Sequence, residues 1–180
     1  MTRRRWLWLL GPLALVLLLV LALLDGRMTD TGGPGIVGFE FAWTSERAAE
    51  ILAEWGPKGH DAALASLWLD YLYLAAYGAF LWLAILALRD AAAARGWVRF
   101  ARPGGVVALV AVGGAAADAV EDAFLLLVLG GHLTSAGPPL AASFASLKFV
   151  CLVVSLGYLL GGLVALGVTR WRGGGAAASA

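Results

Sequence analysis

One apolar stretch, between Gly104 and Leu129, constrains the fold of this chain more than any other. It is long enough to span a membrane, because about 20 apolar residues cross the hydrocarbon core. It nevertheless carries three acids, Asp118, Glu121 and Asp122. Their spacing of i, i+3 and i+4 places them on one face of a helix. Charged groups are costly against lipid, so this face is expected to line a bundle interior or a watery cavity.

The composition indicates an integral membrane protein. Of 180 residues, 61% are hydrophobic and 14% are charged, whereas a soluble domain has about 25% charged residues. A single cysteine, Cys151, excludes a disulfide within the chain, and two histidines are too few for a histidine-rich metal site. Phosphate-binding, nucleophile-elbow and zinc-protease motifs do not occur in the sequence. We therefore expect no metal, no cofactor and no nucleic-acid partner, and the lipid bilayer as the main partner.

Four apolar segments of membrane-spanning length predict four transmembrane helices within one membrane domain, 1–180. Their approximate ranges are 6–24, 62–88, 104–129 and 140–168. The basic residues at positions 3–5 also suit a signal peptide. However, the first apolar run is longer than a usual signal core and lacks a small-residue cleavage site, which favours an uncleaved helix.

The segments between these spans differ in character. The outer loop, 25–61, contains a predicted amphipathic helix that begins at Thr44 or Ser45 and ends at Gly56-Pro57. Its acids lie mainly opposite its apolar face, so we expect it to cap the bundle. The loop 89–103 is short and basic, and the tail 171–180 is expected to be disordered.

The charges of the loops predict the orientation. Nine basic residues lie in the N-terminus, the 89–103 loop and the C-terminus, whereas the outer loop has three basic residues and seven acids. The positive-inside rule then places both termini in the cytoplasm. The prediction is an all-α, transmembrane, up-down four-helix bundle. A bias of 11 arginines to two lysines favours a bacterial protein of the plasma (inner) membrane.

The intramembrane charges fall at one depth on three separate spans. Asp70, Glu121, Asp122 and Lys148 each lie about eight residues, or about 12 Å, from the outer end of their spans. Asp118 lies one turn deeper. Such a coincidence predicts that these side chains meet, with Lys148 pairing with Asp70 or Asp122 and the deepest acid remaining neutral.

Other polar residues extend this predicted cluster. Tyr73 and Tyr77 follow Asp70 on the same face of the second span. Glu40, Trp43 and His132 are candidates for an outer lid. The simpler interpretation is that Glu40 is a solvated acid, Trp43 an interfacial aromatic residue and His132 a loop histidine without a role. The GxxxG motif beginning at Gly157 is compatible with a homodimer.

Three stretches, FEFAWTSERAAEILAEWG, LWLDYLYLAAYG and ADAVEDAFLLL, resemble a pattern of small bacterial four-helix integral membrane proteins that have no known activity. The resemblance covers about residues 36–129. It implies the same architecture and points to Glu40, Asp70, Asp118, Glu121 and Asp122. In outline the layout is also similar to sterol-isomerase-type membrane proteins, whose cavity acids bind a cationic ligand, but their motifs find no residue-by-residue match here.

Three functions are compatible with these patterns. The first is a non-enzymatic protein that binds a cation, a proton or a small amine-bearing ligand in an outward-facing acidic intramembrane pocket. The second is an enzyme that acts on a lipid or isoprenoid by acid catalysis, with Asp118 or Glu121 as the acid; no catalytic residue is assigned beyond that. The third is a structural or assembly subunit whose acids only specify packing. We favour the first, because the excess of acids is not needed for structure.

Overall fold

The fold is built from four long helices and two short ones. The computed structural model describes residues 2–132 and 134–177, and this part of the chain contains no strand. The long helices are α1 (Arg3–Thr29), α3 (Ser45–Ala93), α5 (Gly104–Leu129) and α6 (Gly137–Ala177), and the short ones are α2 (Ile36–Glu40) and α4 (Val98–Ala101). Four helical regions are long and apolar enough to cross a membrane. The all-helical class is confirmed, and the four apolar helices support a multi-pass membrane protein.

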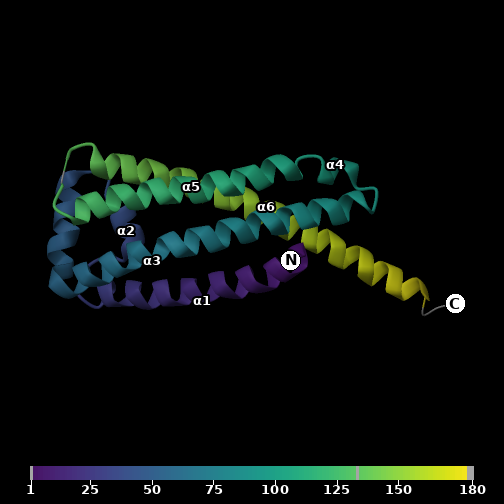
Figure 1. Cartoon of the computed structure of the whole chain (residues 1–180), viewed down its shortest axis with the longest axis horizontal. Helices are drawn as coiled ribbons and strands as arrows, with labels where there is room; N and C mark the ends of the chain where they lie inside the picture. The colour runs from purple at the N-terminus through teal and green to yellow at the C-terminus, as the bar shows by residue number, and fades with distance from the viewer. Residues whose placement is uncertain (1, 133, 178–180) are drawn as a thin grey trace.

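Consecutive long helices are neighbours in space. Helix α1 packs on α3, α3 packs on α5, and α5 packs on α6. Figure 1 shows these helices along the long axis, with α2 and the α5–α6 connection at one end and α4 at the other. The principal contact of α1 is with α3, whereas α6 contacts α5, α3 and α2. Helices α1 and α6 therefore have no extensive contact with each other.

A kink at Gly56 divides α3 into a short first part, which we call the outer part because it lies at one end of the bundle, and a longer apolar part. Gly56 adopts φ 57° and ψ −167°, a left-handed backbone conformation that glycine accepts without steric cost. Pro57 follows and lacks an N–H for the helix ladder. The helix end expected at Gly56-Pro57 is thus a change of direction, and Figure 1 shows the start of α3 turned away from the rest of the helix.

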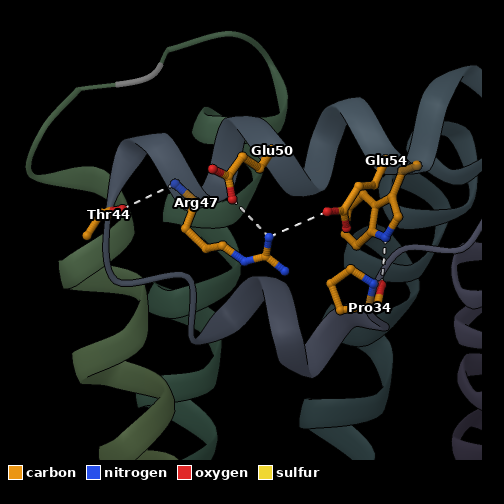
Figure 2. A network of polar contacts seen from close by, with 6 residues as sticks. Pro34, Thr44, Arg47, Glu50 and Glu54 are labelled. Carbon is orange, nitrogen blue, oxygen red and sulfur yellow. Dashed lines mark hydrogen bonds and ion pairs between the residues drawn. The ribbon is translucent and has the colours of Figure 1, made fainter.

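The outer part of α3 begins with a side-chain cap. The Thr44 hydroxyl accepts a hydrogen bond from the Arg47 N–H at 3.2 Å, as expected for an N-cap. Arg47 Nη1 lies 3.0 Å from Glu50 and 3.5 Å from Glu54 (Figure 2). These exposed ion pairs contribute little to stability, so the position of this segment depends on its buried face.

That buried face consists of Ala48, Ile51 and Trp55, each at most 1% exposed. The Trp55 ring lies 5.0 Å from the Phe39 ring of α2, centroid to centroid. Its Nε1 donates a hydrogen bond of 2.6 Å to the Pro34 carbonyl. The outer part of α3 is thereby fastened to α2 and to the connection that precedes it.

Some predicted boundaries differ from the observed ones. Helix α1 extends from Arg3 to Thr29 rather than over 6–24. The predicted loop 89–103 contains the end of α3 and the short helix α4. Most of the tail expected to be disordered is helical, because α6 continues to Ala177; residues 178–180 lie outside the described part of the chain. A helix continues past its apolar segment because its backbone hydrogen bonds do not depend on apolar side chains.

The interior contains two apolar clusters that differ in position along the bundle. One includes Phe39, Trp55, Leu67 and Leu125 near the α2 end. The other includes Ala14, Leu17, Ala76, Leu81, Ile85, Ala108, Ala111 and Ala115. On α3 and α5 the intramembrane acids fall between these two clusters. The buried charges therefore form a polar layer between two apolar cores.

Candidate functional site

Lys148 of α6 is the centre of the polar layer. Its Nζ atom lies 2.8 Å from Glu121 Oε2, 2.9 Å from Asp118 Oδ1 and 3.2 Å from Glu40 Oε1. Lys148 is 6% exposed, and these three acids are at most 7% exposed. The contact with Glu121 is a close ion pair without a well-aligned hydrogen bond, since Oε2 satisfies no hydrogen-bond geometry. One lysine thus contacts acids from α2 and α5.

The expected pairing of Lys148 with Asp70 or Asp122 is wrong. The reason lies in the way that α5 and α6 approach each other near Gly114. A Cβ atom at Gly114 would lie 2.8 Å from the Cβ of Cys151 on α6, so only glycine permits this separation. Asp118 lies one turn along α5 and Lys148 nearly one turn along α6 from that contact. The close approach therefore turns Asp118 and Glu121 toward the lysine.

Asp118 also binds the tyrosine that was predicted to extend the cluster. The Tyr77 hydroxyl donates a hydrogen bond of 2.8 Å to Asp118 Oδ2. Lys148 occupies the other oxygen at 2.9 Å. Each oxygen of the Asp118 carboxyl group therefore has a donor, one from α3 and one from α6.

Three aspartates form a second group beside the lysine, which we call the aspartate triad. It consists of Asp70 from α3 and Asp118 and Asp122 from α5, and one oxygen from each lies within 4.8 Å of the others. Asp122 is 2% exposed, and its Oδ2 atom has no hydrogen-bond partner among the described residues. Burying a carboxyl oxygen without a partner is costly, so this atom marks a position where a donor or cation is missing.

The triad forms part of a cavity of about 300 Å³, the acidic pocket. Its polar lining consists of the triad, Ser66, Tyr73, Tyr77, Lys148, Glu40 and Asp25. Its apolar lining comes from four helices and consists of Leu18, Leu21, Ala22, Ile36, Val37, Leu67, Phe149 and Leu152. Glu121 contacts Lys148 from outside this lining. The pocket combines a concentrated set of acids with largely apolar walls.

Glu40 enters the site because α2 folds over it. The Asp25 carboxylate at the end of α1 accepts a hydrogen bond of 2.6 Å from the Ile36 N–H at the start of α2. A Cβ at Gly35 would collide with that carboxylate, so the glycine leaves room for this contact. Burial raises the pKa of Glu40 above its ordinary value, against the opposing effect of Lys148. Its Oε2 atom has no partner among the described side chains.

The other two residues of the expected lid lie elsewhere. Trp43 is 50% exposed and has a positive φ of 52°, and His132 is exposed in the α5–α6 connection. Neither lines the acidic pocket. Of the three lid residues, only Glu40 reaches the site.

Sequence reasoning missed the contribution of α1. Leu18, Leu21 and Asp25 line the acidic pocket, yet no residue of this helix was among the predicted site residues. Asp25 was detectable as the first acid after the apolar run. The two leucines have no distinguishing signal, because every position of this segment is apolar.

Comparison of the chain with protein-family models, with curated proteins and with solved structures found no match.

Proposed function

We propose that this protein is an up-down transmembrane four-helix bundle that binds a cation in the acidic pocket. The cation is an ion or the protonated amine of a small ligand. In this arrangement the bundle crosses the plasma membrane of a bacterium with both termini in the cytoplasm. The outer part of α3 and α2 then cap the extracytoplasmic end, above the pocket.

The observation that carries this proposal is the unpartnered oxygen of Asp122, a residue that lines the acidic pocket. Asp122 is 2% exposed, so bulk water does not satisfy it. The other triad members supply two more oxygens within 4.8 Å. A cation placed among the three oxygens would give Asp122 a partner and offset part of the negative charge of the triad.

The charge balance of the polar layer supports the same conclusion. The polar layer holds one ammonium group, that of Lys148, and five carboxyl groups, those of Glu40, Asp70, Asp118, Glu121 and Asp122. Lys148 is committed to Glu40, Asp118 and Glu121. Asp70 and Asp122 have no cationic partner in the described structure. They are the acids whose charge a bound cation or protons would neutralise.

A purely structural role fits this geometry less well. Buried charges that only fix helix order are expected to be fully paired, because a half-satisfied network is less stable than an apolar core. Here oxygens of Glu40 and Asp122 lack partners. Acid catalysis on a lipid or isoprenoid is the second candidate, and the apolar walls beside the triad favour it, with Asp118 of the triad as the acid.

The test is a thermal-unfolding titration of the full chain in lipid nanodiscs. Sodium, potassium, magnesium, calcium and methylammonium chlorides would be compared at constant ionic strength. At least one cation is expected to raise the Tm, because a ligand that binds only the folded state at 100 times its Kd stabilises by about 2.7 kcal/mol. Asp122→Asn should abolish this rise and should itself raise the Tm of the ligand-free protein.

Asp61→Asn provides the matched control. Asp61 is an exposed acid of α3 outside the acidic pocket, so this variant should retain the cation effect. If no cation shifts the wild-type Tm, the proposal is wrong. If Asp122→Asn lowers the Tm of the ligand-free protein by several degrees, the structural hypothesis is the better one.

A further inference from the structure

We propose that the occupant of the acidic pocket is an amphiphilic amine that reaches it from the bilayer, between α1 and α6. Its ammonium group would bind the aspartate triad, and its apolar chain would lie against the leucines of α1 and the α6 wall. This inference rests on the proposed cation-binding function and specifies the chemical class of the ligand.

The triad has the geometry of an ammonium receptor. Hydrogen bonds from an ammonium to carboxylates are about 2.8 Å long, and its three free N–H groups point along tetrahedral directions. Three acceptors around one nitrogen are then separated by about 4.6 Å. The triad oxygens lie within 4.8 Å of one another, which is compatible with this separation. An ammonium would bring a donor to the Asp122 carboxyl group, one oxygen of which has no partner among the described residues.

The size of the pocket exceeds what a bare ion needs. A volume of about 300 Å³ corresponds to roughly ten water-sized groups at about 30 Å³ each. An ion bound by three carboxylates occupies only the acidic part of that volume. The rest is bounded by Leu18, Leu21 and Leu152, among other apolar side chains. Apolar walls of this kind favour a chain of methylene groups over ordered water.

The pocket also reaches the lipid-facing surface. Leu18 of α1 and Phe149 of α6 both line it, yet they are 46% and 38% exposed. Helices α1 and α6 have no extensive contact that would close this side. Lys148 and Glu40 are 6% and 7% exposed, so the charges lie behind an apolar margin. An amphiphile can therefore approach with its chain in lipid and its amine toward the triad.

The experiment measures binding of octylamine, methylammonium and octanol to the full chain in phosphatidylcholine nanodiscs at pH 7 by isothermal titration calorimetry. Octylamine has both the charge and the chain, and each control lacks one of them. Octylamine is expected to bind at least about tenfold more tightly than either control, because several methylene groups leave water and lipid headgroups. Asp122→Asn should weaken octylamine binding by at least about tenfold.

Two neighbouring residues of α6 provide a matched pair of variants that tests the role of the apolar walls of the pocket. Leu152→Trp fills the pocket, whereas Val153→Trp changes a side chain that is 71% exposed and outside the lining. Leu152→Trp should weaken the binding of octylamine by at least about tenfold and leave the affinity for methylammonium within about twofold of the wild-type value. Val153→Trp should change the affinity for neither ligand. Circular dichroism checks folding, and Leu152→Phe replaces the larger variant if that one does not fold.

The outcomes separate this inference from the proposed function. If methylammonium binds as tightly as octylamine, or Leu152→Trp leaves octylamine binding unchanged, the amphiphile inference is wrong while the cation site stands. Equal binding of octanol and octylamine would also overturn the inference, because the triad would then play no part in recognition. If neither amine nor any metal cation binds, the proposed function itself fails.

Discussion

Replacement of Lys148 by methionine tests the charge arrangement most directly. The substitution keeps most of the side-chain volume and removes the ammonium that lies 2.8–3.2 Å from three carboxyl groups. At these distances each contact has a gross attraction of about 5–6 kcal/mol with an effective dielectric constant near 20. Desolvation and repulsion among the acids offset most of this attraction.

Protonation of the acids limits the net loss. Adding a proton to a glutamate at pH 7 costs about 3.7 kcal/mol, given an ordinary pKa of about 4.3. Breaking a buried ion pair by removal of one partner costs about 3–5 kcal/mol. We therefore expect a loss of that size for Lys148→Met, which corresponds to a fall in Tm of about 6–20 °C for a chain of this length.

The assay is thermal unfolding in nanodiscs between pH 5 and pH 8. The difference between wild type and Lys148→Met should narrow as the pH falls, because protons replace the charge that the lysine supplied. Lys58→Met removes an exposed lysine and should change stability by less than about 0.5 kcal/mol. If Lys148→Met matches that control at pH 8, the polar layer is not held together by this lysine, and the proposed charge balance is wrong.

Three further variants test single contacts. Because the pKa of Glu40 is raised, the folded state keeps a proton that the unfolded chain loses above about pH 4.5, and wild-type stability falls as the pH rises. Glu40→Gln removes this titration and should therefore flatten the decline of Tm with pH. An unchanged slope would contradict the burial of Glu40 beside Lys148. Gly114→Ala should cost about 1–3 kcal/mol because its Cβ would lie 2.8 Å from an α6 side chain. Gly113→Ala, with open space around it, should be neutral or stabilising. Equal effects of the two substitutions on stability would refute the close approach of α5 and α6. Tyr77→Phe should cost about 1–3 kcal/mol by leaving a buried carboxylate oxygen without its donor. If chemical denaturation shows that this variant is as stable as the wild type, the hydrogen bond is not formed.

The features that the sequence predicted well depend on local chemistry. The end of the outer helix at Gly56-Pro57 follows from a residue that accepts positive φ and one that lacks an N–H. The cap at Thr44 follows from a hydroxyl one position before the helix. The four long helices follow from apolar segments whose length exceeds the thickness of a bilayer. None of these features requires knowledge of a distant contact.

The partners of Lys148 illustrate what local chemistry leaves undecided. The fixed rise per residue places the intramembrane charges at one depth, and the structure brings them together. Glu121 and Asp122, however, differ by about 100° around a helix with 3.6 residues per turn. The rotation of α5 about its own axis therefore decides which of them faces the lysine. Close packing sets that rotation, since a Cβ at Gly78 would lie 2.8 Å from Ala115 and one at Gly114 equally close to Cys151.

Glu40 and Leu18 depend on tertiary structure in a different way. Glu40 reaches Lys148 only because the Asp25 carboxylate holds the start of α2 and Trp55 packs on Phe39. Leu18 lines the acidic pocket only because α1 lies against α3 and not against α6. Its sequence neighbours are equally apolar. Such positions cannot be distinguished until the helices are placed.

The excess of acids over cations argues for function because it opposes stability. A polar layer that served only to order the helices would be more stable with matched charges, or with an amide in place of Asp122, since its Oδ2 atom is buried without a partner. Sites that retain such a cost are typically those where a ligand later satisfies the group. The orphan oxygen belongs to a residue that lines the acidic pocket, and the apolar walls of this pocket include the exposed side chains of Leu18 and Phe149. The unpartnered carboxyl oxygen and the apolar walls therefore belong to the same pocket, as expected for a receptor whose ligand carries both a positive charge and an apolar chain.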